Sequence, residues 1–162
     1  MKATLLFLST LFFTVGLDIA QVRKAYIASP KSEAAAMKFA ELVKDVAKED
    51  ANKVLVAYKG CSMALKSKHS NFLPDKISFM KEGAAFMDAA AAASPKDIEI
   101  RMIRMSVQEN VPFIVDYRDK IQEDKNVILA NFAKSSKEVK ALVLNYAKLS
   151  EAFSKDEVAR LK

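Results

Sequence analysis

Apolar residues recur at steps of three and four along most of this chain, a spacing that places them on one face of an α-helix. No segment shows the regular alternation of a half-buried strand. The pattern predicts an all-α fold of about six helices and a short C-terminal helix. One of these helices is expected around residues 121–132. The other expected starts are residues that can cap or open a helix: Ser29-Pro30, Asp50, Pro74-Asp75, Ser94-Pro95, Ser135 and Ser154.

The third and fourth expected helices have the clearest boundaries. The third begins at Pro74 and carries an apolar stripe that starts at Ile77 and includes several methionines, which are expected in the core. Pro95 lies in the first turn of the fourth helix. Pro112 ends or kinks that helix, because proline disfavours a helical conformation of the residue before it.

The first twenty residues follow a different pattern. Lys2 precedes an uncharged, mostly apolar run over residues 3–17, which is typical of a secretory signal peptide. A helix of that length spans about 22 Å, less than the hydrocarbon core of a bilayer at about 30 Å. A cleaved export signal is therefore expected rather than a permanent anchor, and the mature protein is expected in the periplasm or outside the cell.

The cleavage site has two candidates. Cleavage after Gly16 suits the preference for small residues, whereas cleavage after Ala20 suits Leu17 and Ile19 as the end of the apolar segment, and the second is favoured. The only cysteine is Cys61, so no cysteine follows the apolar run for lipidation. The expected organisation is a signal peptide at 1–20, a linker at 21–28 and a single helical domain at 29–162.

Composition supports helices held together by packing. A single cysteine excludes an internal disulfide, and Gly60 and Gly83 are the only glycines beyond the signal segment. Both lie within helical patterns, where glycine costs about 1 kcal/mol relative to alanine. They are nearly equidistant from the loop at residues 71–72, so in an antiparallel hairpin they would meet at one level. A close crossing of the two helices is expected there.

The stretch from about Asn52 to Pro95 resembles a tetratricopeptide-type helical hairpin. Read back from Pro95, Ala90, Met87 and Gly83 match the small, large and small positions of that motif's second helix. Gly60 would be the small residue of the first helix, although it lies farther from Gly83 than in a standard repeat. The resemblance implies hairpins packed in a tetratricopeptide-like, right-angle array.

A second resemblance covers about half of the chain. The run Glu99 to Arg104, together with Gln108, Pro112 and the run Glu123 to Lys125, is similar to small exported helical proteins of bacteria. This resemblance implies an exported helical protein and no particular activity.

Arg101, Arg104 and Gln108 share one sector of the fourth expected helix, with apolar residues on both flanks. A helix with two apolar flanks is expected to be central. The arginines could grip a carboxylate or phosphate ligand, since guanidinium groups bind such anions through paired hydrogen bonds. They could instead form a structural ridge paired with acids, for which the candidates are Asp97, Asp116, Asp119 and Glu123.

The net charge of +6 is concentrated in two stretches. Residues 51–74 contain no acid, and residues 125–148 contain five lysines with Glu138 as the only acid. The basic residues of the first stretch are Lys53, Lys59, Lys66, Lys68 and His69. Such faces are solvated or dock on an anionic surface. Nucleic acid is not an expected partner, because the charge is moderate, arginines are few and tryptophan is absent.

Catalytic and metal-binding patterns are weak. Cys61 and His69 would lie about 12 Å apart along a continuous helix, too far for a thiolate–imidazole pair, so Cys61 is expected to be a buried thiol. A single histidine disfavours the usual zinc, di-iron and copper sites, and no cofactor or metal is expected. The acids Asp116, Asp119, Glu123 and Asp124 suit a helix start, and less readily the paired carboxylates of a hydrolase.

The sequence therefore predicts an exported, non-enzymatic helical protein that binds a protein or peptide, with Arg101, Arg104 and Gln108 as candidate ligand-binding residues. Two alternatives remain. The first is a peripheral envelope protein held through its lysine-rich faces, and the second is an envelope hydrolase that uses the acidic cluster.

Overall fold

The computed structural model describes residues 16–112 and 115–161, so most of the expected signal peptide lies outside the described residues. Within those ranges the chain forms eight α-helices, two short 3-10 helices and no strand, which confirms the all-α prediction. The α-helices are α1 (Ile19–Ala28), α2 (Glu33–Leu42), α3 (Lys53–His69), α4 (Leu73–Ala93), α5 (Ile98–Asn110), α6 (Ile121–Asn131), α7 (Lys137–Ala147) and α8 (Lys155–Arg160). The 3-10 helices are η1 (Ser29–Lys31) and η2 (Phe132–Lys134). No described helix is long and apolar enough to cross a membrane.

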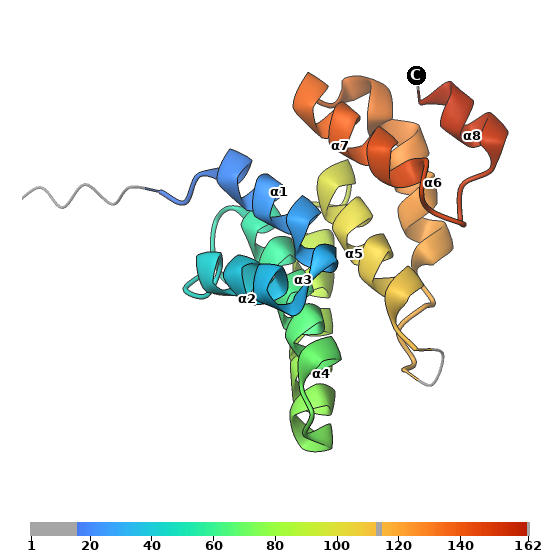
Figure 1. Ribbon diagram of the computed structural model, residues 1–162. Helices are drawn as coiled ribbons and strands as arrows, with labels where there is room; N and C mark the ends of the chain where they lie inside the picture. The colour runs from blue at the N-terminus through green and yellow to red at the C-terminus, as the bar shows by residue number, and fades with distance from the viewer. Residues whose placement is uncertain (1–15, 113–114, 162) are drawn as a thin grey trace, which may run out of the picture.

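Helix α5 lies at the centre of the fold, between α1–α4 on one side and α6–α8 on the other (Figure 1). It packs against α3, α4, α6 and α7, and ten of its residues are buried, polar ones included. Its two apolar flanks are filled by neighbours, with Ile98, Met102 and Met105 on one and Ile100 and Ile103 on the other, all buried. The prediction of a central helix with two packed flanks is confirmed.

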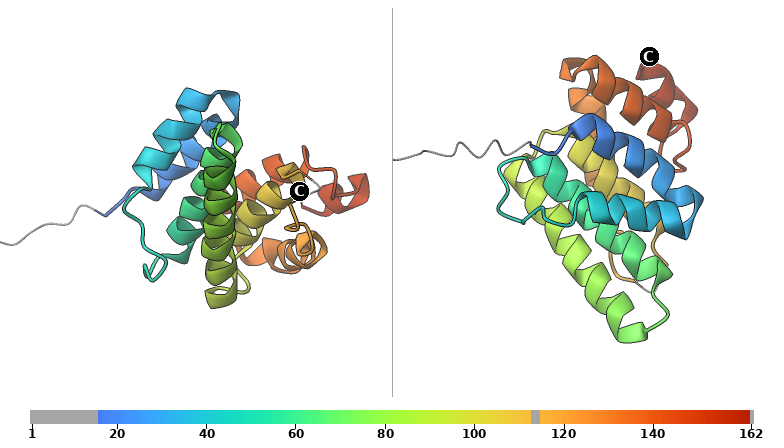
Figure 2. Two further views of the ribbon diagram at one scale, coloured as in Figure 1. Left: turned by 90° about the horizontal axis from the view of Figure 1, so that it is seen from below. Right: turned by 60° about the vertical axis from the view of Figure 1, so that its left-hand side comes forward.

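The longest helices, α3 and α4, form an antiparallel hairpin that extends beyond the other helices (Figures 1 and 2). The two helices cross at Gly60 and Gly83, as the spacing predicted. A Cβ atom added at Gly60 would lie 2.6 Å from the carbonyl oxygen of Gly83, and one added at Gly83 would lie 2.6 Å from that of Gly60. Only glycine allows the two backbones to approach so closely.

The region expected to be a linker is helical instead. Residues 21–28 belong to α1, which is capped by Asp18 and buries Val22 completely. Tyr26 joins Phe39 and Tyr58 in a cluster of tilted and edge-on rings with centroids 5.2–6.1 Å apart. Helix α1 therefore belongs to the core of the domain, which begins before residue 21.

Several helix starts differ by a few residues from the sequence prediction. The cap of α2 is Ser32 rather than Ser29, because Ser29-Pro30 forms the 3-10 turn η1. Asn52 replaces Asp50 as the cap of α3, and Asp97 replaces Ser94 as the cap of α5. In each case a polar side chain two or three residues farther along accepts the free N–H groups of the first turn.

The remaining boundaries are closer to the prediction. Helix α5 ends just before Val111-Pro112, as proline at this position requires. Helix α7 is capped by Ser136, one residue after the expected Ser135. Ser154 and Glu157 form the expected capping box of α8, with both reciprocal hydrogen bonds present.

Candidate functional site

The three candidate ligand-binding residues lie together on the face of α5 that packs against α6. Arg101 and Arg104 are 5% and 4% exposed, and Gln108 is fully buried. The prediction that they share one sector of a central helix is therefore confirmed. Their partners come from α4, from α6 and from the segment before α5.

Asp124 of α6 is the centre of this cluster and is fully buried. One of its carboxylate oxygens accepts hydrogen bonds from Arg101 Nη1 at 3.0 Å and Arg104 Nη2 at 2.7 Å. The other accepts from Arg104 Nε at 2.9 Å and Gln108 Nε2 at 3.1 Å. Gln108 in turn accepts from the backbone N–H of Lys120, at the start of α6, at 2.9 Å. One carboxylate thus collects the side chains of all three candidate residues.

The outer groups of the two arginines are also bound by the protein. Arg101 donates to Glu123 at 2.6 Å and, through Nε and Nη2, to the carbonyl oxygen of Pro95 at 3.2 and 2.9 Å. Arg104 donates to Asp88 of α4 at 3.0 Å, and Asp88 also accepts from the hydroxyl of Tyr117 at 3.1 Å. Pro95 lies in the turn before α5 and not in the first turn of that helix as expected, and its carbonyl group binds Arg101.

The positive charges of this cluster are neutralised by carboxylates of the protein. Burial alone lowers the pKa of Arg104, but the hydrogen bonds and negative charge of Asp124 and Asp88 outweigh it and raise that pKa above its ordinary value. Three carboxylates, those of Asp88, Glu123 and Asp124, face the two guanidinium groups. An added anion would therefore meet excess negative charge. The geometry supports the structural interpretation of the arginine ridge, in which Glu123 was one of the expected partners.

The acids that suggested a hydrolase do not form one group in the structure, and three of the four are paired with basic side chains. Asp124 and Glu123 bind the arginines of α5, and the Arg101 hydrogen bond holds the pKa of Glu123 below its ordinary value. Asp119 pairs with the adjacent Lys120 at 2.8 Å, and Asp116 is exposed. Among the described residues, no three His, Cys, Asp or Glu side chains gather in a way that could hold a metal ion.

A second buried polar cluster was not predicted from the sequence. Glu99 is 1% exposed and accepts two hydrogen bonds from Arg23 of α1, at 2.8 and 2.6 Å, and one from the Tyr58 hydroxyl at 2.6 Å. The hydrogen bond and charge of Glu99 raise the pKa of Arg23. The only signal in the sequence was the position of Glu99 between two buried isoleucines. This cluster joins α1 and α3 to α5.

Glu109, near the end of α5, joins α5 to α7 and to the segment that follows α7. It accepts hydrogen bonds from the Tyr146 hydroxyl, from Ser150 Oγ at 2.7 Å and from the backbone N–H of Ala152 at 3.2 Å. Burial, followed by the hydrogen bond to Glu109, raises the pKa of Tyr146. Every buried polar side-chain atom of the described residues has such a partner. The polar groups of α5 hold helices together.

Cys61 and the methionines are core residues, as expected. Cys61 is a free, buried thiol in the middle of α3, and burial raises its pKa to about 12, which suppresses the reactive thiolate. His69 lies at the end of the same continuous helix. Met63, Met80, Met87, Met102 and Met105 are all buried.

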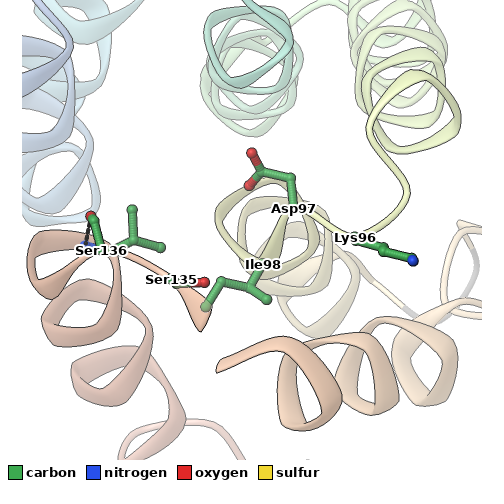
Figure 3. A pocket seen from close by; sticks show the side chains of 6 residues that line it. Lys96, Asp97, Ile98, Ser135 and Ser136 are labelled. Atoms are coloured by element: carbon green, nitrogen blue, oxygen red, sulfur yellow. Dashed lines mark hydrogen bonds between the residues drawn. The ribbon is translucent and has the colours of Figure 1, made fainter. Parts of the chain in front are cut away.

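The described surface has shallow clefts, two of which are considered for ligand binding. The smaller, of about 220 Å³, lies between the starts of α5 and α7, where Lys96, Asp97, Ser135 and Ser136 line it (Figure 3). Its main polar side chains cap their own helices: Asp97 accepts from the N–H groups of Glu99 and Ile100, and Ser136 from that of Val139. The larger, of about 530 Å³, is lined by residues 16–17 and by residues between Leu42 and Leu55.

The tip of the α3–α4 hairpin exposes large apolar side chains to solvent. Phe72, Leu73 and Ile77 are 61%, 65% and 48% exposed. Ile77 was expected to begin the buried stripe of its helix, but its side chain is exposed, and the buried part of the stripe begins at Met80. The hairpin extends past the core, so an apolar pattern that is regular in sequence loses its packing partners at this end.

Basic residues surround the same tip. Within residues 66–81 there are four lysines, Lys66, Lys68, Lys76 and Lys81, with Asp75 as the only acid. Lys59, farther from the tip, donates to the Lys44 carbonyl oxygen at 2.7 Å, and burial, followed by the charge of Lys66, lowers its pKa. The second lysine-rich stretch, over α6 and α7, lies at the opposite end of the molecule (Figures 1 and 2).

The described residues thus contain three internally paired polar clusters around α5, centred on Asp124, Glu99 and Glu109, and an exposed apolar and basic tip on the hairpin. Comparison of the chain with protein-family models, curated proteins and solved structures finds no match to any of them.

Proposed function

We propose that the protein is a non-enzymatic, exported helical protein that attaches to an anionic surface of the cell envelope through the tip of the α3–α4 hairpin. The observation that carries this proposal is the exposure of Phe72, Leu73 and Ile77 on a projecting tip that is surrounded by lysines. A contiguous exposed apolar patch marks an interaction site on a soluble domain. The basic residues around it select an anionic partner.

The candidate ligand-binding residues favour the hairpin tip as the attachment site, because Arg101 and Arg104 are already paired with acids of the protein. A protein or peptide partner at Arg101 and Arg104 would have to displace Asp124, Glu123 or Asp88 from them. A hydrolase at the acidic cluster would need carboxylates free of cations, and Glu123 and Asp124 are bound by the same arginines. Among the described residues, none covers the apolar side chains of the tip, which stay about half exposed or more.

The resemblance of residues 52–95 to a tetratricopeptide-type hairpin enters as part of the proposal. The reciprocal approach of Gly60 and Gly83 supports it, because close helix crossing at small residues is what the motif requires. The right-angle array implied by that resemblance is proposed on the same basis. In this fold such a hairpin serves as a projecting arm.

We expect the exported protein to begin at Leu17, so that cleavage follows Gly16 rather than Ala20. Asp18 caps α1 by accepting from the N–H of Ala20 at 2.9 Å, and Leu17 and Ile19 pack against the core. Cleavage after Ala20 would remove the cap, at a cost of about 1 kcal/mol, together with these contacts. The intact mass of the exported protein distinguishes the two sites, and a chain that begins at Gln21 would contradict this expectation.

We expect attachment to the envelope to be released by salt. At about 1 M ionic strength the Debye length falls to about 3 Å, which screens lysine contacts with surface anions. A Lys66→Gln/Lys68→Gln/Lys76→Gln variant should shift from the membrane fraction to the soluble fraction of fractionated cells at low salt. The matched control, Lys134→Gln/Lys137→Gln/Lys148→Gln, removes as many charges from the opposite end and should leave the distribution unchanged. Equal release of the two variants would contradict attachment through the tip.

A further inference from the structure

The exposed apolar residues of the hairpin tip lie in a compact group at its extreme end. Phe72 ends the three-residue loop between α3 and α4, and Leu73 is the first residue of α4. Ile77 follows Leu73 by four positions and lies on the same side of the helix. The loop between α3 and α4 lies at the projecting end of the hairpin (Figures 1 and 2), so these three exposed apolar residues are grouped at that end.

Two lysines lie beside this surface: Lys76 directly precedes Ile77 in α4, and Lys66 lies in the last turn of α3. Lys66 precedes the end of α3 by three residues, and Lys76 follows the start of α4 by three residues, which places each about 5 Å along its helix from the loop. The interface between lipid headgroups and acyl chains is about 5–10 Å deep for interfacial segments. If the tip enters that interface, the long lysine side chains can extend to the phosphates.

The tip is also held in shape before it binds. Ser67 Oγ donates to the carbonyl oxygen of Lys76 at 2.7 Å and ties the two helices together close to the loop. The backbone N–H of Phe72 donates to Ser70 Oγ at 3.2 Å, and Pro74 lies in the first turn of α4. A preformed tip loses little conformational entropy on binding.

From this arrangement we infer that the anionic surface is a phospholipid bilayer, and that Phe72, Leu73 and Ile77 insert into its interface while Lys66 and Lys76 contact headgroup phosphates. The inference rests on the proposed function and names its partner. A soluble or wall-bound polyanion would satisfy the lysines but would leave the three apolar side chains in water. A bilayer accommodates both sets, because long lysine side chains can reach the phosphates from the same helix turns that carry the apolar side chains.

The absence of tryptophan from the sequence provides a direct test of insertion. In a Phe72→Trp variant the new side chain is the sole tryptophan. With vesicles of equimolar phosphatidylcholine and phosphatidylglycerol, its fluorescence should shift to the blue and be quenched by lipids brominated on the acyl chain. The control is Leu149→Trp at a position that is 86% exposed on the opposite part of the fold, where neither change is expected.

Binding to the same vesicles should depend on the tip. A Phe72→Ser/Ile77→Ser variant should bind at least tenfold more weakly, since the lost burial of two large apolar side chains exceeds that factor. The control, Ile27→Ser/Leu149→Ser, changes two other exposed apolar residues and should bind like the parent protein. A Lys66→Gln/Lys76→Gln variant should lose about 25-fold in affinity, because each lysine near an anionic membrane contributes about fivefold. Circular dichroism checks that each variant is folded.

The outcomes separate this inference from the proposed function. Binding to heparin, with no response of the Phe72→Trp variant's fluorescence to vesicles, would overturn the bilayer inference and leave attachment to an anionic surface standing. The same holds if the Phe72→Ser/Ile77→Ser variant binds vesicles as well as its control does. If the protein binds neither vesicles nor heparin, both the bilayer inference and the proposed attachment to an anionic surface are overturned. Equal binding to vesicles of pure phosphatidylcholine would overturn the role of the lysines.

Discussion

An Asp124→Ala variant is expected to lose about 3–5 kcal/mol of the free energy of unfolding, the range for a buried ion pair that has lost one partner. The carboxylate of Asp124 accepts four hydrogen bonds, from Arg101, Arg104 and Gln108. Without it, two nearly buried guanidinium groups lose an acceptor in a region that water does not reach freely. Since small domains are stable by about 5–15 kcal/mol, the variant should be partly unfolded or melt at a much lower temperature.

The matched control is Glu123→Gln in the neighbouring position of α6. The Glu123 side chain is about half exposed and forms the outer ion pair of Arg101, so its loss should cost less than about 1 kcal/mol. Urea denaturation followed by circular dichroism gives both free energies. If Asp124→Ala were as stable as Glu123→Gln, the polar cluster would not hold α5 to α6, and the arginines would again be candidates for ligand binding.

A Gly60→Ala variant is expected to be destabilised by about 2–3 kcal/mol, although alanine favours helix formation over glycine by about 1 kcal/mol. The new methyl group would lie 2.6 Å from the carbonyl oxygen of Gly83 and 3.0 Å from the backbone nitrogen of Met87. Backbone atoms of a long helix cannot rotate away, so α3 and α4 must separate. Thermal unfolding measures the loss, and Ser78→Ala, on the exposed side of α4, is the control and should be neutral or slightly stabilising.

The double variant Gly60→Ala/Gly83→Ala sharpens this test. Once the first methyl group has forced the helices apart, the second finds space already opened, so the two losses should sum to more than the loss in the double variant. Strict additivity would show that each glycine is needed for a local reason and that the two helices do not meet at this pair.

These two predictions rest on features that the sequence revealed to different degrees. The glycine crossing could be predicted because it depends on two residues and one short loop, whose symmetry is visible in the spacing. The shared face of Arg101, Arg104 and Gln108 followed from helical periodicity. Glu123 was among the expected partners because it comes from the next helix along the chain. Asp124 was assigned to a helix start, where acids are common, and its burial was not visible.

The features that were missed depend on contacts between distant residues. Arg23 and Glu99 are 76 positions apart, and nothing local marks them as partners. The helical conformation of residues 21–28 was missed because nothing local distinguishes this segment from a linker. Ile77 fitted the buried stripe of its helix, and only the length of the hairpin relative to its neighbours shows that the stripe is uncovered at that end. The caps of α2 and α5 were misplaced because serine-proline pairs precede helices at more than one distance.

The position of α5 has a consequence for the order in which the chain can become folded as it emerges amino terminus first, from a ribosome or across a membrane. Helix α1 cannot bury Arg23 until Glu99 has appeared, and Tyr26 must wait for its partner Ser106. The α3–α4 hairpin needs only its own residues and can close earlier. The polar contacts between α1 and α5 can therefore form only after about two thirds of the protein has emerged.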